Sequence, residues 1–142
     1  MMKQESSHFL GRLEEFNRPR RFKIEGRSVA VWLHKGNVYA LDANCYHSSG
    51  HLEKHVEDIE DIQDEPCIRC PIHKYVISLK TGHSFYQPVQ ICKDGNKVNI
   101  NKLDWKSKGY KQRTHRAYIK DGNVYLTLNK DSHAVESDIY NN

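Results

Sequence analysis

The hydrophobic positions of this chain fall in short runs of β-forming residues that are separated by turn residues. Residues 28–33 and 38–41 flank a Lys-Gly-Asn turn, and residues 113–119 and 123–128 flank an Asp-Gly-Asn turn in the same way. Apolar residues alternate with Tyr and Thr in the last of these runs. Such pairs of runs around a glycine-containing turn predict β-hairpins. Further strands are predicted at 67–69, 75–79 and 84–87, and a third turn at 94–96.

Helical periodicity is scarce in this sequence. In residues 51–62 the apolar positions fit either a short amphipathic helix or an acidic surface loop. Residues 101–112 are rich in Lys, Asn and Gly and predict a connection. Residues 131–142 are polar, with little to bury, and predict a loose C-terminal tail. The pattern therefore predicts one all-β domain over residues 1–130.

Composition and charge narrow the class of protein. The 142 residues are 37% hydrophobic and 28% charged, with a net charge of +4. A nucleic-acid-binding protein usually concentrates positive charge more strongly, so no nucleic-acid partner is expected. No apolar run reaches the ~18 residues that cross a bilayer, and residues 1–12 lack the apolar stretch of a secretory signal. These features predict a cytoplasmic protein without a membrane partner, in which cysteines serve as ligands or remain free.

Charges of each sign gather in separate segments. Basic residues concentrate at 18–23 and 106–116, and acidic residues at 57–65. Each segment is either an ordinary solvated surface or one half of a complementary docking patch.

Two short motifs hold the candidate chemistry. The first is Cys45-Tyr46-His47, directly after a predicted strand, and the second is Cys70-Pro71-Ile72-His73. Each motif offers one thiolate and one imidazole on a tight loop. Together they supply two cysteines and two histidines, a ligand set that suits either one zinc ion or the two irons of an iron–sulfur cluster.

The spacing of the ligands favours the cluster over zinc. Structural zinc sites usually take a pair of cysteines from one loop and a matched pair from the other. A two-iron centre in which one iron takes both thiolates and the other takes both imidazoles requires one ligand of each kind from each loop. Both motifs here are mixed in this way. A structural zinc-binding interaction module with the same four ligands remains the alternative.

The pattern C-x-H followed by C-P-x-H resembles the signature of Rieske [2Fe–2S] proteins. The resemblance extends to the ferredoxin type of the family, which includes a small protein found in animals. It rests on Leu52, the Thr-Gly turn at 81–82 and the tract from Cys70 to Gln87. The resemblance implies a Rieske-type antiparallel β-sandwich or barrel with an inserted cluster-binding subdomain at about 42–88. It also implies that Cys45, His47, Cys70 and His73 hold one [2Fe–2S] cluster.

The departures from the family pattern are informative as well. Respiratory members carry a disulfide between the two loops, whose cysteines would fall at Gly50 and Ile72. They also carry hydrogen-bonding Ser and Tyr at the positions of Tyr75 and Ile77. Fewer hydrogen bonds to sulfur stabilise the reduced cluster less, which predicts a potential nearer roughly −150 mV than +300 mV.

The resemblance therefore implies a single-electron carrier without a catalytic site of its own. The 142 residues of the chain leave no room for the mononuclear iron domain of a Rieske oxygenase. The expected partners are a flavin-containing reductase and an oxidase- or oxygenase-type electron acceptor.

Other cysteines and histidines have simpler interpretations. Cys67 lies three residues before Cys70, but no thioredoxin-like pattern surrounds the pair, so a core or free thiol is favoured over a redox or ligand role. Cys92 is interpreted as a strand residue. His51 and His55 are interpreted as loop histidines, since the four-ligand set is complete without them.

Overall fold

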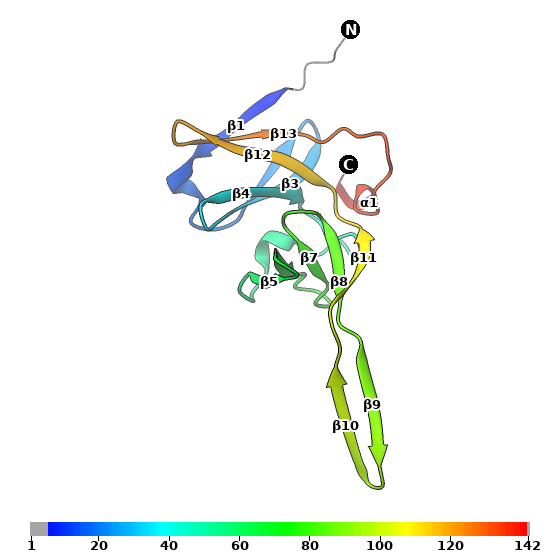
Figure 1. Cartoon of the computed structure of the whole chain (residues 1–142). Helices are drawn as coiled ribbons and strands as arrows, with labels where there is room; N and C mark the ends of the chain where they lie inside the picture. The colour runs from blue at the N-terminus through cyan, green and yellow to red at the C-terminus, as the bar shows by residue number, and fades with distance from the viewer. Residues whose placement is uncertain (1–5, 142) are drawn as a thin grey trace.

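The computed structural model describes residues 6–141 and is built almost entirely from antiparallel β-strands (Figure 1). One six-stranded sheet has the order β1-β13-β12-β4-β3-β2, so that strands from both ends of the chain lie side by side. The prediction of an all-β fold is confirmed. The strands of this sheet are β1 (Ser7–Arg12), β2 (Arg20–Ile24), β3 (Arg27–His34), β4 (Asn37–Asp42), β12 (Thr114–Lys120) and β13 (Asn123–Thr127).

A second, five-stranded sheet is inserted between β4 and β12 in the sequence. Its order is β11-β8-β7-β6-β5, and it lies against the end of the first sheet (Figure 1). Its strands are β5 (Glu60–Ile62), β6 (Glu65–Arg69), β7 (Val76–Ser78), β8 (His83–Tyr86) and β11 (Lys106–Tyr110). Because β11 belongs to this sheet, residues 101–112 are not the simple connection that the sequence predicts.

A two-stranded hairpin projects from the second sheet. It consists of β9 (Val89–Asp94) and β10 (Lys97–Lys102), which pair only with each other among the described strands (Figure 1). The turn predicted at 94–96 connects these two strands. We call residues 89–102 the arm.

The two larger apolar clusters form most of the core. One lies inside the six-stranded sheet and includes Phe16, Val31 and Leu126. The other lies between the two sheets and combines Trp32 and Leu41 of the first with Ile68, Ile77 and Leu79 of the second. Burying each such aliphatic side chain contributes about 1.5–3 kcal/mol. The second cluster also contains Cys45 and Cys70, so the core that joins the sheets is also the floor of the candidate site.

Residues 51–62, whose pattern fits either a helix or a loop, form neither a full helix nor an unstructured loop. This segment contains a single 3-10 turn, η2 (Leu52–Lys54), and then β5, because only Leu52 and Ile62 of its apolar residues are buried. Several of its carboxylates pair with basic residues of the same chain. Glu57 pairs with Arg69 and Lys74.

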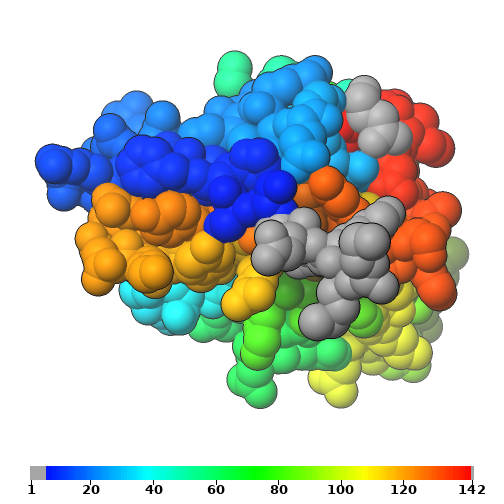
Figure 2. Space-filling model, turned by 90° about the horizontal axis from the view of Figure 1, so that it is seen from above, coloured from blue at the N-terminus to red at the C-terminus, as the bar shows by residue number. Residues whose placement is uncertain are grey.

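The C-terminal segment differs from the predicted loose tail. Val135, Ser137 and Asn141 are buried, and the segment ends in a short helix, α1 (Asp138–Asn141). Figure 2 shows this red segment packed against the body of the molecule. The sequence conceals this packing because the buried contacts are hydrogen bonds and ion pairs, which leave no apolar pattern. Residues 1–5 and 142, which belong to the predicted domain and tail, lie outside the described residues.

A buried polar network attaches this segment to the sheet. Asp42, fully buried, accepts hydrogen bonds from Arg27 (2.6 and 2.7 Å), His115 (2.8 Å) and Ser137 (2.6 Å). Asp138 pairs with Arg113 and with Arg27. Burial alone would raise the pKa of Asp42, but the hydrogen bonds from Arg27, His115 and Ser137 outweigh it and lower this pKa. The Arg113 guanidinium likewise lowers the pKa of Asp138.

These lowered pKa values predict acid sensitivity. A carboxylate with a folded-state pKa below its unfolded value of about 3.9 stabilises the fold fully above that pH, and the contribution is lost as pH falls through the folded-state pKa. We therefore expect the free energy of unfolding in urea to decline below about pH 4, and to decline less steeply in Asp138→Asn. Asp58→Asn, an exposed control, should retain the wild-type slope. Equal slopes in Asp138→Asn and wild type would contradict the assignment.

Candidate metal centre

The first motif forms a closed loop between β4 and η2. The Cys45 N–H donates to the Gly50 carbonyl at 2.8 Å, and the Ser49 N–H donates to the Cys45 carbonyl at 2.9 Å. Ser49 adopts a left-handed φ of 61° to close the loop. The Cys45 side chain therefore points into the core while His47, at the tip, is exposed.

The second motif repeats this geometry between β6 and β7. The Cys70 N–H donates to the Tyr75 carbonyl at 2.8 Å, and the Lys74 N–H donates to the Cys70 carbonyl at 3.1 Å. His73 and Lys74 have left-handed φ values of 53° and 59°. A left-handed backbone conformation is unfavourable for residues other than glycine, and such strained residues are frequent in functional loops. The two loops are thus a matched pair, each of which buries a cysteine and exposes a histidine.

The two sulfurs lie together at the inner side of the site. Cys45 and Cys70 are both fully buried. A hydrogen bond from Cys45 lowers the pKa of Cys70 to about 7, and the same contact together with burial raises the pKa of Cys45. Gly50 is required beside them, because a Cβ at this position would lie 2.7 Å from the Cys70 Sγ. The inner pair is therefore pre-assembled in a dry environment.

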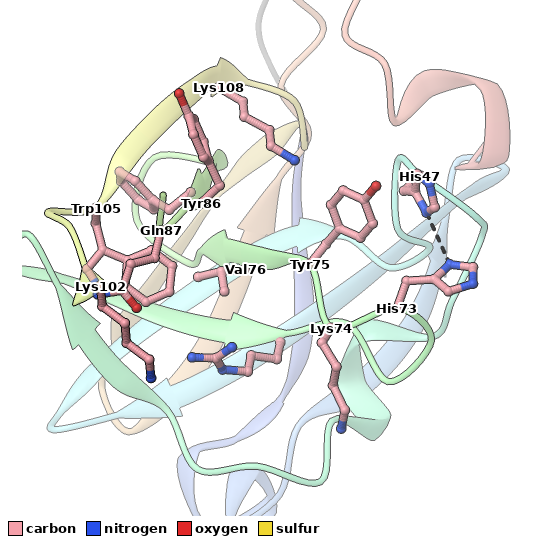
Figure 3. Close-up of a pocket in the computed structure, with 12 residues that line it drawn as sticks. His47, His73, Lys74, Tyr75, Val76, Tyr86, Gln87, Lys102, Trp105 and Lys108 are labelled. Atoms are coloured by element: carbon pink, nitrogen blue, oxygen red, sulfur yellow. Dashed lines mark hydrogen bonds between the residues drawn. The ribbon is translucent and has the colours of Figure 1, made fainter. Parts of the chain in front are cut away.

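The two imidazoles lie together at the outer side. The Nδ1 atoms of His47 and His73 face each other at 3.3 Å (Figure 3). Each is a possible metal-binding atom, and the two rings meet edge to face with their centres 5.1 Å apart. The structure thus brings the four predicted site residues into two pairs, one of sulfurs and one of imidazoles.

This division bears on the kind of metal centre that fits. Within residues 6–141 no three Cys, His, Asp or Glu side chains converge closely enough to hold a single ion. A [2Fe–2S] centre with Rieske ligation needs two thiolates at one iron and two imidazoles at the other. The residues present fit the cluster.

Aromatic and basic side chains cover one side of the histidine pair. The Tyr75 ring stacks on His47 with centres 4.1 Å apart, and the Lys108 ammonium lies 4.6 Å from the centre of the Tyr75 ring. Figure 3 shows Tyr75 between Lys108 and the two histidines. Tyr46 lies deeper, where its hydroxyl bonds to Ser84 at 2.7 Å and burial raises its pKa to about 12.

Gln112 positions the first loop, although no sequence signal identifies it. This side chain is fully buried, its Oε1 accepts the Tyr46 N–H at 2.9 Å, and its Nε2 donates to the carbonyls of Asp42 (2.8 Å) and Asn44 (2.7 Å). Gly82 allows this arrangement, since a Cβ there would lie 2.0 Å from the Gln112 carbonyl. A polar residue in a polar segment has no periodic pattern that would indicate such a role.

The remaining candidates have structural contacts. Cys67 is buried in a separate apolar cluster with Ile62, and burial raises its pKa to about 12. His55 accepts a hydrogen bond from the Trp32 indole at 3.2 Å and bonds to the Glu57 carbonyl through its other nitrogen. His51 is exposed and lies beside Glu53. Cys92 is an exposed residue of β9.

A groove of about 670 Å³ runs from the histidine pair toward the base of the arm. Figure 3 shows His47 and His73 at one end of it and Lys102 and Trp105 at the other. The groove therefore connects the candidate centre with a second feature of the surface.

Known proteins resemble this chain over most of its length. A family profile for soluble Rieske-type ferredoxins matches residues 8–131. The human Rieske domain-containing protein is 40% identical over 137 residues, which cover 95% of this chain and 83% of the human one. The ferredoxin subunit of 3-phenylpropionate/cinnamic acid dioxygenase from Photorhabdus laumondii is 21% identical over 103 residues, 72% of this chain and 75% of the subunit.

A solved structure supports the fold. The ferredoxin of carbazole 1,9a-dioxygenase from Nocardioides aromaticivorans IC177 superposes with a TM-score of 0.60 at 16% identity, over 88% of this chain and 99% of that ferredoxin. The predicted Rieske-type architecture is confirmed. No described helix is long and apolar enough to cross a membrane. Matched over most of its length by sequence and by fold, the chain belongs to the family of soluble Rieske-type ferredoxins.

Proposed function

We propose that this protein carries single electrons through one [2Fe–2S] cluster held by Cys45, His47, Cys70 and His73. The observation that carries the proposal is the division of these residues into a buried sulfur pair and an exposed nitrogen pair on two matched loops. When bound, such a cluster supplies a one-electron couple, at a higher potential than an all-cysteine centre because neutral imidazoles leave it less negative.

The protein side chains perform the remaining tasks. The core around Cys45 and Cys70 excludes water from the thiolates, which protects them from exchange and oxidation. His47 and His73 reach the surface, so the shortest route for an electron between the site and a partner passes their rings. Lys108, above Tyr75, places a positive charge near that route, which stabilises added negative charge.

The partners proposed are a flavin-containing reductase as donor and an oxidase- or oxygenase-type protein as acceptor. Two relatives support the acceptor, since their names describe them as ferredoxins of dioxygenases. We propose a carrier without a catalytic site of its own. A cytoplasmic location is proposed too, because none of the four cysteines is in a disulfide, a state that a reducing compartment would preserve.

The test is the visible spectrum of freshly purified protein before and after dithionite, with iron and sulfide analysis. We expect a coloured protein that partly bleaches on reduction and holds about two iron and two sulfide per chain. A colourless protein with one tightly bound zinc, before and after anaerobic reconstitution with iron and sulfide, would replace the proposal with a structural zinc module.

A further inference from the structure

The arm exposes an amphipathic surface that nothing in the described chain covers. Every residue of β9 and β10 is exposed. Isolated two-stranded hairpins are at best marginally stable in water, so an apolar face on such a hairpin calls for a covering partner.

The strand register separates the arm into two different faces. Directly opposed residues of an antiparallel pair lie on the same face. Ile91 opposes Ile100, and at the two ends of this face Lys93 opposes Val98 and Lys102 opposes Val89. The four aliphatic side chains are each 51–64% exposed. The other face is polar and consists of the pairs Gln90–Asn101, Cys92–Asn99 and Asp94–Lys97.

The apolar face continues into the groove beside the histidines. Lys102 belongs to this face of the arm and also lines the groove (Figure 3). A hydrogen bond from the Gln87 amide to the Leu103 carbonyl at 3.1 Å ties the base of the arm to the end of β8. The arm and the candidate centre therefore present one continuous surface.

That surface has uncompensated positive charge. Arg69 and Lys74 of the groove pair with Glu57. Within residues 6–141, Lys93, Lys102 and Lys108 have no carboxylate partner. Positive charges around a small apolar patch complement a partner with acidic side chains around an apolar patch, and they accelerate its association.

We propose that the apolar face of the arm and the adjoining groove form one docking surface for an acidic redox protein. The proposal rests on the electron-carrier function and adds the chemistry of the partner. In such a complex the partner packs on Ile91 and Ile100, while its acidic rim meets Lys93, Lys102 and Lys108. This arrangement brings the partner against His47 and His73.

Two other occupants fit the surface less well. A second copy of the chain would bring lysine against lysine, because both ends of the apolar face carry one. Four aliphatic side chains also fall short of the ~800 Å² per partner that a stable dimer buries, whereas electron-transfer complexes are small and transient. A bilayer is flat on this scale and would leave the concave groove unfilled.

The test measures the second-order rate at which the dithionite-reduced protein is oxidised by two probes. These are soluble cytochrome b5, an acidic haem protein, and cytochrome c, a basic one. We expect the rate with cytochrome b5 to fall as ionic strength rises. It should drop about tenfold or more in Lys93→Glu/Lys102→Glu, and also in Ile91→Ser/Ile100→Ser. Gln90→Ser/Asn101→Ser, an opposed pair on the polar face, should react like wild type.

Several outcomes would overturn the docking proposal. One is wild-type rates with cytochrome b5 in both arm variants while their visible spectra remain unchanged. Sedimentation with phosphatidylcholine/phosphatidylserine vesicles, or a dimer in analytical ultracentrifugation, that is lost in Ile91→Ser/Ile100→Ser would assign the face to a membrane or a second copy. A protein without a visible spectrum would instead refute the electron-carrier function, so the two failures are distinguishable.

Discussion

Cys70→Ser is expected to abolish the visible absorption of the purified protein, while Cys67→Ser keeps it. Serine oxygen is a poor replacement for a thiolate in an iron–sulfur centre. Cys70 lies in the core cluster beside Cys45, at the inner side of the site, whereas Cys67 belongs to a separate cluster. The measurement is the visible spectrum with iron and sulfide content per chain, after anaerobic reconstitution of each variant.

The Cys67 variant also serves as the control for folding. Replacing this buried thiol by a hydroxyl should lower the free energy of unfolding by about 1–2 kcal/mol. A Cys67→Ser protein that is less stable but still coloured shows that mild destabilisation alone does not remove the chromophore. If Cys67→Ser lost its colour and Cys70→Ser retained it, the ligand assignment would be wrong.

Ending the chain at Lys130 is expected to lower the free energy of unfolding by at least about 3–5 kcal/mol, the loss caused by removing one partner of a buried ion pair. Asp138 would be lost while Arg113, only 4% exposed, stays in place. Asn44, next to Cys45, would lose the Asn141 side chain that its N–H contacts at 2.8 Å. We therefore expect both lower stability and faster loss of colour, measured by urea unfolding and by bleaching under a chelator.

A matched control lies in the same segment. Glu136 forms a surface ion pair with Lys111, and such pairs contribute about 0–1 kcal/mol. Glu136→Gln should therefore unfold near the wild-type urea concentration. A truncated protein whose free energy of unfolding matched that of wild type within about 1 kcal/mol would show that the buried network does not support the site.

Local chemistry could be predicted from the sequence because it acts over a few residues. The β-hairpins around glycine-containing turns are present at the predicted places, since alternation and turn residues determine a hairpin locally. The motifs around Cys45 and Cys70 were identifiable for the same reason: each closes a loop of five or six residues, and the order of thiolate and imidazole can be seen in the sequence itself. The charge of the site also follows from residue types alone.

The tertiary structure decided everything that depends on residues far apart in the chain. Gln112 reaches the Cys45 loop from 66 residues away, and Asn141 reaches Asn44 from 97 away. Each of these contacts is made by one polar side chain, so no periodic pattern in the sequence indicates it. Strand β11 was hidden in a segment of Lys, Ser and Gly, because an exposed strand beside β8 needs no apolar alternation.

The arm illustrates most clearly both what the sequence determines and what only the tertiary structure decides. The sequence by itself determined the turn at 94–96 and the apolar positions at Val98 and Ile100. Only the tertiary structure decided that those side chains remain exposed and that Lys102 joins their face to the groove. Apolar residues ordinarily mark a core, and whether a given strand finds one depends on long-range packing, which the local pattern does not contain.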